Sequence, residues 1–153
     1  LDNFNSLLYG ISKKELSRLQ RIQNAAARVV TKARKDAHIT PILMQLHWLP
    51  ILYRIHYKIL LLTFKALNGK APQYLSDLLL RKDSIENRHM THRSDNAYLL
   101  VVPRVKSKFG ECSFSHSAPL LWNSLPLNCR AEKSISRFKS CLKTILFKKA
   151  FKI

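Results

Sequence analysis

One amphipathic pattern dominates the chain between Ser12 and Lys35. Ser12 is followed three residues later by Glu15. This spacing is typical of a capping box, in which each side chain satisfies a backbone N–H at the start of a helix. Apolar residues then recur at steps of three and four, which predicts one long helix whose apolar stripe packs on the rest of the chain. The stripe consists of Leu16, Leu19, Ile22, Ala26, Val29, Val30 and Ala33.

Basic residues recur along a different face of the same predicted helix. Only Glu15 interrupts the positive charge between Lys13 and Lys35. Residues at steps of three, four and seven line up beside one another on a helix, so these side chains form one charged surface. It is either a solvated helix face or a surface for an acidic partner. We call this surface the basic face; it consists of Lys14, Arg18, Arg21, Arg28, Lys32 and Lys35.

Further helices are predicted on both sides of a polar loop. Thr40 and Pro41 are a typical helix start, with Ile42, Leu43 and Leu46 on the buried side. The most hydrophobic segment, 51–67, is the predicted centre of the core and ends at Asn68-Gly69. The other predicted helices are a short one closed by Gly10, one over 72–80, one around 114–122 that Pro119 breaks or begins, and one over 134–149.

The predicted fold is mostly α: a single helical domain of about five to six helices with one short extended segment. The domain has a helical part at 1–80, a polar loop at 81–97 and a C-terminal part at 98–153 with a basic last helix. The extended segment, Tyr98–Val102, is stopped by Pro103 and either pairs near Val105 or packs alone. A loop of this length is usually functional or disordered, and its basic residues could become ordered on RNA.

Several separated blocks resemble the C-terminal region of non-LTR retrotransposon reverse transcriptases of the LINE type, jockey-like elements in particular. The blocks include RIQNAAARVV, HITPILMQLHWLP, LLVVPR and SFSHSAPLLWNSLP, and they follow one another in the family's order. The resemblance implies a segment that follows the polymerase domain and helps hold template RNA or target DNA during target-primed reverse transcription. It also implies the parent's polymerase domain as a partner, and an intracellular location, nuclear with a cytoplasmic ribonucleoprotein stage.

The charge of the chain agrees with a polyanionic partner. Lys and Arg number 27 against nine acids, a net charge of +18 that divides equally between residues 1–76 and 77–153. A field of this sign favours nucleic acid or an anionic membrane. We expect RNA or DNA to be bound through the basic faces of the first and last helices, and we expect neither a membrane nor a small-molecule substrate as a partner. The expected contacts are Lys14, Arg18, Arg21, Arg28, Lys32, Lys35, Lys139, Lys143, Lys148 and Lys149.

Motifs for chemistry are missing from the sequence. Two-metal polymerases need clustered carboxylates, and no two aspartates are adjacent here. The chain has only three glycines and no P-loop, so we expect neither an enzyme nor a cofactor. Cys112 and His116 lie four residues apart, and Cys129 and Cys141 could complete a set of four ligands. The spacing does not match structural zinc sites, and we therefore expect no metal.

Two other interpretations stay open. In the first interpretation, the segment is a structural brace for the polymerase, or a degenerate retroelement remnant without independent activity. Alternatively it binds a membrane surface through its basic amphipathic last helix, although Ser136, Ser140 and Thr144 dilute the polar face of that helix. Every uninterrupted apolar run, Ile59–Leu62 among them, is far shorter than the roughly 20 residues that cross a bilayer.

Overall fold

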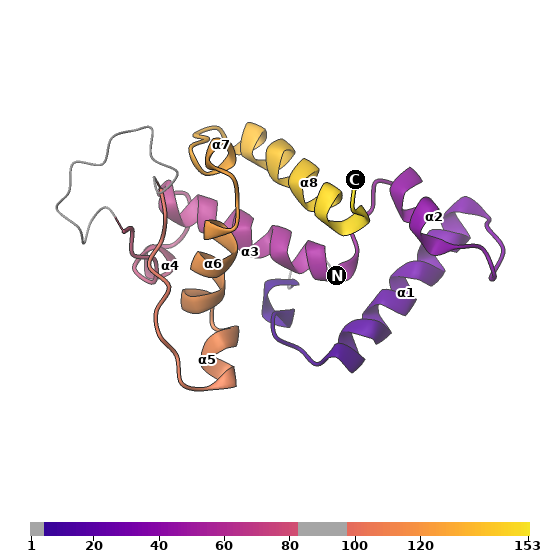
Figure 1. Cartoon of the computed structure of the whole chain (residues 1–153), viewed down its shortest axis with the longest axis horizontal. Coiled ribbons are helices and arrows are strands. Elements are labelled where there is room, and N and C mark those ends of the chain that lie inside the picture. Colours follow the sequence, from indigo (N-terminus) through magenta and orange to yellow (C-terminus); the bar gives the residue numbers. More distant parts are fainter. Residues whose placement is uncertain (1–4, 83–97) are drawn as a thin grey trace. The chain divides into compact units, whose positions relative to one another are not determined.

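A computed structural model describes residues 5–82 and 98–153 of the chain (Figure 1). Its elements confirm the mostly α class. The described residues contain eight α-helices rather than five to six, because the short α5 and α7 have too few residues to show a periodic pattern. The elements are η1 (Asn5–Leu8), α1 (Lys13–Thr31), α2 (Ile39–Gln45), α3 (Ile51–Leu67), α4 (Gln73–Ser76), α5 (Lys108–Cys112), α6 (Phe114–Asn123), α7 (Leu127–Arg130) and α8 (Ile135–Phe151).

The chain divides into two units that do not follow the predicted parts 1–80 and 98–153. The first contains residues up to Tyr57 together with Lys143–Ile153, and the second is Lys58–Leu142. Helices α3 and α8 therefore contribute residues to both units. Apart from Arg81 and Lys82, the loop predicted at 81–97 lies outside the described residues.

In the first unit, α1 and α2 pack against each other (Figure 1). Ser12 caps α1 by accepting a hydrogen bond from the Glu15 N–H at 3.3 Å, which is one half of the predicted capping box, whereas the Glu15 Oε1 accepts from Arg18. Lys32 ends the helix with φ 53°. The packed side chains are Ala27, Ile42 and Leu43, and around them lie Ala33, Ala37, Ile39, Leu46, Trp48 and Phe151. The absence of a bulky side chain at Ala27 lets the two helices approach closely.

The predicted apolar stripe of α1 is wrong in its orientation. Ile22, Val29 and Val30 are 59%, 78% and 59% exposed, whereas Gln23 and Ala27 are the buried residues of the helix. Successive residues on a helix are about 100° apart, so the buried side is turned by roughly one residue position from the predicted stripe. The physical reason lies in Gln20 and Gln23, which satisfy backbone groups that an apolar side chain could not satisfy.

Gln20 and Gln23 hold the corner that leads into α3. The Gln23 Nε2 donates to the Leu49 carbonyl at 2.8 Å, and the Ile51 N–H donates to the Gln20 Oε1 at 2.9 Å. The Gln20 Nε2 also donates to the Gln23 Oε1 at 2.9 Å, which joins the two amides into one network. Ile51 is the first residue of α3, so its N–H has no partner within the helix. A side chain from α1 therefore caps α3.

Helix α2 begins at Ile39 rather than at the predicted Thr40-Pro41. His38 is its N-cap residue and makes no side-chain cap bond. Pro41 lies in the first turn, where its missing N–H would have no partner within the helix in any case. Ile42 and Leu43 are buried as predicted, and Leu46 is half-buried.

In the second unit, three stacked rings from separate helices form the centre of the core. The Phe64 and Phe138 rings lie 4.2 Å apart between centroids with an interplanar angle of 17°, and Trp122 stacks on Phe138 at 5.8 Å. Phe64 and Phe138 have no exposed surface, and Trp122 has 2%. These rings join α3, α6 and α8 within the unit.

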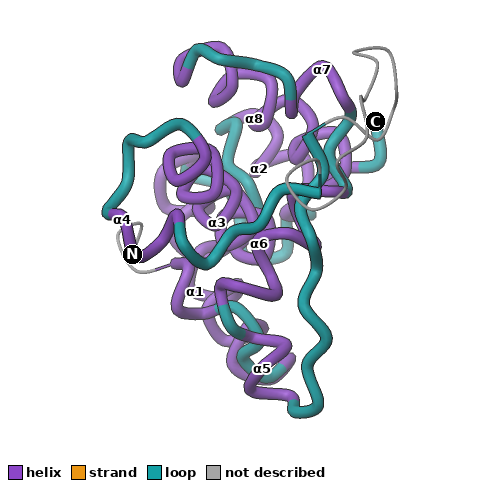
Figure 2. Tube along the Cα trace, turned by 90° about the vertical axis from the view of Figure 1, so that its left-hand side faces the viewer, coloured by secondary structure: helices purple, strands orange, loops and turns teal. Residues whose placement is uncertain are grey.

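The extended segment at 98–102 is present but forms only an isolated bridge, so Figure 2 draws no strand among the described residues. Its partner is Arg81 rather than the neighbourhood of Val105: the Val101 N–H donates to the Leu80 carbonyl at 2.8 Å. On its other side the Leu100 N–H donates to the Asn123 Oδ1 at 2.9 Å, and the Asn123 Nδ2 donates to the Leu100 carbonyl at 2.8 Å. The carboxamide of Asn123 thus replaces a second strand.

Two further helix predictions need correction. Helix α4 covers only Gln73–Ser76 instead of 72–80, because residues 80–82 pair with the extended segment. Tyr74 and Leu78 are exposed. Helix α6 continues through Pro119 instead of breaking or beginning there. Pro119 is buried within the helix, and burial with Ala118 and Trp122 outweighs the hydrogen bond that proline removes. The predicted last helix is confirmed over Ile135–Phe151.

We expect Phe138→Ala to destabilise the chain by about 3–5 kcal/mol, because the substitution removes a fully buried ring that stacks on two others. Urea unfolding followed by circular dichroism measures the loss. Phe109→Ala is the matched control: Phe109 is 91% exposed, and its removal should change the free energy of unfolding by less than about 0.5 kcal/mol. Equal effects of the two substitutions would contradict this account of the core.

We expect Gln23→Leu to cost about 1–3 kcal/mol although it adds apolar surface, because the buried Leu49 carbonyl loses its donor. The same urea experiment tests this expectation. Gln45→Leu, at an exposed position on α2, supplies the control for the change of residue type. A Gln23→Leu variant as stable as the unmodified chain would show that the corner does not need the amide.

Candidate nucleic-acid interface

The basic face of α1 is partly present in the structure. Lys14, Arg18 and Arg21 are exposed along the helix, and Lys32 is exposed at its C-cap. Arg18 lies 3.0 Å from the Glu15 carboxylate, but both side chains are more than half exposed, so the pair contributes little to stability. These side chains can exchange such contacts for phosphate oxygens at small cost.

We call the exposed basic residues Lys14, Arg18, Arg21 and Lys32 the exposed flank of α1. Arg28 and Lys35, the other two predicted residues of the basic face, do not belong to it. Arg28 is half-buried, and its Nη2 donates to the Ala37 carbonyl at 3.1 Å. This contact holds the turn after α1 and gives Arg28 a structural role. Lys35 is exposed but lies beyond the end of the helix. Spacing cannot reveal the bond between Arg28 and Ala37, and it places Lys35 on the helix face only by assuming a helix that continues past Thr31.

The four predicted lysines of α8 are exposed but do not form a single surface. Lys139 and Lys143 are four residues apart and share one side of the helix, while Lys148 lies about 140° further round from Lys143. Lys149 is adjacent to a packed region, because its backbone carbonyl accepts a hydrogen bond from the Tyr53 O–H at 3.2 Å. Lys139 belongs to the second unit and the other three to the first.

The exposed flank of α1 combines charge with apolar side chains. Ile22 and Val29 are exposed beside Arg18 and Arg21 on the outward side of the helix. The outer surface of α1 therefore presents both basic and apolar side chains.

Tyr53 and Tyr57 lie one helical turn apart on α3, next to Arg54 and Lys58 in sequence, and both tyrosines are half-buried. The Tyr53 hydroxyl is engaged with the Lys149 carbonyl, and burial raises the pKa of Tyr57. A segment that sequence reasoning missed is more accessible: Arg104, Lys106 and Lys108 are exposed, and Phe109 follows them with 91% of its surface exposed. The sequence contains a signal for this segment, because basic residues occupy every second position between 104 and 108.

The thiols show no arrangement for chemistry. Burial, followed by a side-chain hydrogen bond between Cys129 and Cys141, raises the pKa of the Cys129 thiol to about 12. The reactive thiolate form is therefore negligible at neutral pH. The His116 Nδ1 lies 3.0 Å from the Pro103 carbonyl oxygen. Within residues 5–82 and 98–153, no three His, Cys, Asp or Glu side chains gather in a way that could hold a metal ion.

Comparison of the sequence with protein-family models, with curated proteins and with solved structures found no match in any of the three. The retrotransposon resemblance therefore stays a prediction. None of the helices in the described part of the chain is long and apolar enough to cross a membrane.

His56 gives the first unit a pH dependence that can be measured. Its ring is half-buried, 6.1 Å from the Tyr9 ring and 6.0 Å from the Tyr53 ring between centroids. Burial, and then the positive charge of Lys149, lower the pKa of His56 from its ordinary value of 6.5. Below that pH the unfolded chain binds more protons at this site than the folded chain, so stability falls as pH decreases through 6.5.

We expect His56→Gln to remove part of this decline. Free energies of unfolding measured from pH 7.5 down to pH 5 should fall less steeply in the variant than in the unmodified chain. His38→Gln, at an exposed position, is the control for the change of residue type. A parallel decline in the unmodified chain and in His56→Gln would show that the His56 proton is not linked to folding.

Proposed function

We propose that this chain is a non-catalytic nucleic-acid-binding segment from the C-terminal region of a LINE-type retrotransposon reverse transcriptase. The observation that carries the proposal is the exposed flank of α1, where Lys14, Arg18 and Arg21 line one side of a 19-residue helix and Lys32 follows at its end. The net charge of +18 supplies the long-range attraction for a polyanion.

The expected mode of binding is contact with phosphates. Lysine and arginine side chains on one helix flank neutralise backbone phosphates and release counterions, which gives affinity and a strong dependence on salt. Phosphate contacts position a nucleic acid without reading its sequence. In the parent protein such a segment would help hold template RNA or target DNA beside the polymerase domain during target-primed reverse transcription, in the nucleus after a cytoplasmic ribonucleoprotein stage.

A non-catalytic role is supported by the state of the side chains that could otherwise react. The Cys129 thiol is buried and protonated at neutral pH. The acidic residues of the sequence are few, and no pair of aspartates is adjacent. The described helices therefore offer charged surfaces for binding rather than reactive side chains.

A structural brace is the second candidate, and the exposed apolar side chains of α1 favour it. Ile22, Val29 and Val30 are each more than half exposed on a helix that is otherwise well capped. When another surface covers such exposed apolar side chains, the free energy of the system falls because apolar area is removed from water. On this interpretation α1 packs on the polymerase domain of the parent protein, and its charges serve only solubility.

We expect the quadruple variant Lys14→Gln, Arg18→Gln, Arg21→Gln, Lys32→Gln to lose most of its affinity for a labelled stem-loop RNA. Fluorescence anisotropy from about 50 to 200 mM salt should give a steep salt slope for the unmodified chain and a slope smaller by up to about four for the variant, because each phosphate contact contributes roughly one unit.

The matched control removes the same charge elsewhere. Lys70→Gln, Lys82→Gln, Arg137→Gln, Lys152→Gln changes four exposed basic residues outside the proposed surface and lowers the net charge equally. Retained binding in this control separates the α1 flank from a general effect of charge. If both quadruple variants bind like the unmodified chain, or if the unmodified chain does not bind RNA at all, the brace replaces the binding segment as the better proposal.

A further inference from the structure

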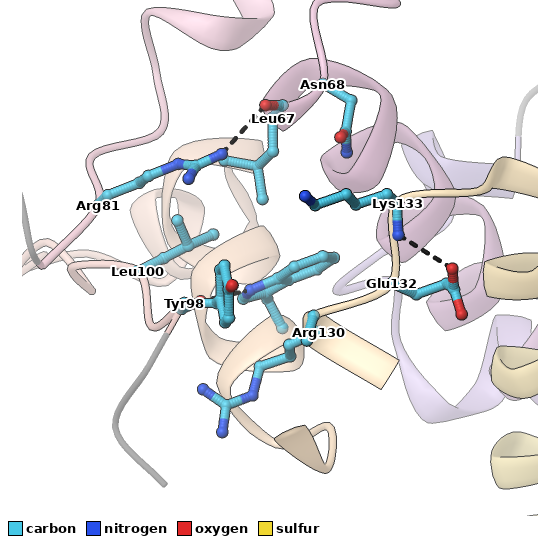
Figure 3. Close-up of a pocket in the computed structure, with 10 residues that line it drawn as sticks. Leu67, Asn68, Arg81, Tyr98, Leu100, Arg130, Glu132 and Lys133 are labelled. Carbon is cyan, nitrogen blue, oxygen red and sulfur yellow. Dashed lines mark hydrogen bonds between the residues drawn. The ribbon is translucent and has the colours of Figure 1, made fainter. Parts of the chain in front are cut away.

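A cavity of about 140 Å³ lies within the second unit, and none of the basic residues expected as nucleic-acid contacts on α1 and α8 lines it (Figure 3). Pockets for drug-sized ligands measure roughly 300–1,000 Å³, so this cavity has room for one small group rather than for a large molecule. Its lining residues come from the end of α3, the Arg81 bridge, the extended segment, α6 and the turn before α8. They are Leu67, Asn68, Arg81, Tyr98, Leu100, Trp122, Arg130, Ala131, Glu132 and Lys133.

Arg81 and Lys133 point toward one another across this cavity (Figure 3). Arg81 is anchored by one nitrogen, the Nη2, which donates to the Leu67 carbonyl at 3.1 Å. The ammonium of Lys133 approaches from the opposite wall. Neither residue forms a salt bridge with an acidic side chain of the described part of the chain. Two like charges facing one space repel each other, and an anion between them would reverse that effect.

Among the residues that the structure describes around the cavity, the carboxylate is that of Glu132, and it is directed away from the cavity. The Glu132 Oε1 accepts hydrogen bonds from the backbone N–H groups of Lys133 at 3.0 Å and Ser134 at 3.2 Å. Figure 3 shows this carboxylate on the far side of the Lys133 backbone from the lysine ammonium. Its charge therefore stabilises the start of α8, and it is not placed to neutralise the ammonium group.

Two of the other lining residues are well packed. Leu100 and Trp122 are buried, and the Trp122 Nε1 donates to the Tyr98 carbonyl at 2.9 Å. Tyr98 has φ 62°, a conformation that costs a residue other than glycine of the order of 1 kcal/mol and persists only where its surroundings enforce it. Such enforced backbone conformations concentrate at ligand sites. The cavity is thus shaped before any ligand arrives.

We propose that this cavity binds a phosphoryl group between the Arg81 guanidinium and the Lys133 ammonium. The guanidinium offers planar N–H donors to two oxygens, and the ammonium supplies a compact charge to a third. The group could be a backbone phosphate of a nucleic acid or the phosphate of a free mononucleotide, since both present the same oxygens. This inference goes beyond the proposed function, which depends on α1 and on a different unit of the chain.

The first test is a titration of the full chain with inorganic phosphate at constant ionic strength, followed by the indole N–H resonances in ¹H–¹⁵N NMR spectra. Trp122 lines the cavity and Trp48 does not, so the second indole is an internal control. We expect a saturable shift of the Trp122 resonance at millimolar phosphate, and no such shift when potassium chloride replaces the phosphate.

Substitutions then assign the contact. Lys133→Gln should weaken phosphate binding by about tenfold or more, the effect of losing a charge-assisted hydrogen bond. Lys82→Gln, beside Arg81 in sequence but outside the lining, should leave the affinity unchanged. Lys133 is exposed and its side chain makes no packing contact in the core, so its substitution preserves the fold, whereas Arg81→Gln also removes the bond to the end of α3.

Two further ligands distinguish the sources of the phosphoryl group. If a short single-stranded oligouridylate shifts the Trp122 resonance and Lys133→Gln abolishes the shift, the cavity takes a backbone phosphate. If uridine monophosphate binds and the oligonucleotide does not, it takes a free phosphate. The inference is overturned if phosphate moves the Trp122 resonance no more than potassium chloride does, or moves it equally in Lys133→Gln. The α1 variants tested against RNA do not alter this outcome, so either proposal can fail alone.

Discussion

The hydrogen bonds of Gln20 and Gln23 are the constraint on which the first unit depends. Helix α3 starts after Pro50, with no serine, threonine or aspartate to cap it, and the turn before it carries carbonyls that also need partners. An unsatisfied buried backbone group costs more than a typical hydrogen bond contributes, so the orientation of α1 must bring both amides to this corner. Packing between Ala27 and α2 then follows from an orientation that the amides have already determined.

This choice decides what α1 presents on its outer side. Once Gln20, Gln23 and Ala27 face inward, Ile22 and Val29 must face outward beside Arg18 and Arg21. A helix cannot bury both sides on a unit of this size. The resulting surface therefore combines apolar side chains with a net positive charge, and this combination is suited to a partner that offers phosphates together with exposed bases or apolar groups. The two functions proposed above are two interpretations of this one surface.

Sequence reasoning found the elements more reliably than their faces. The bounds of α3, the Ser12 cap of α1 and the last helix could be predicted, because periodicity and capping are local signals. The buried side of α1 could not, because it depends on backbone groups 26 and 31 residues away along the chain. The same reason applies to Arg28, whose partner Ala37 lies beyond the helix, and to Asn123, whose carboxamide pairs with Leu100 like a neighbouring strand. The exposure of Lys14, Arg18 and Arg21 could be predicted, since charge alone excludes them from a core.

The blocks that resemble the reverse transcriptase family contain the side chains that hydrogen-bond to the backbone of distant segments. Gln23 lies in RIQNAAARVV and bonds to Leu49 in the next block, while Trp122 and Asn123 lie in SFSHSAPLLWNSLP and bond to the backbone at Tyr98 and Leu100. Such residues specify how the chain folds and say little about what it binds. Function must therefore be sought in the exposed basic side chains of α1, outside this buried network, and at the cavity between Arg81 and Lys133. Lys14, Arg18, Arg21 and Lys133 are exposed, so they can be substituted while the fold that presents them is preserved.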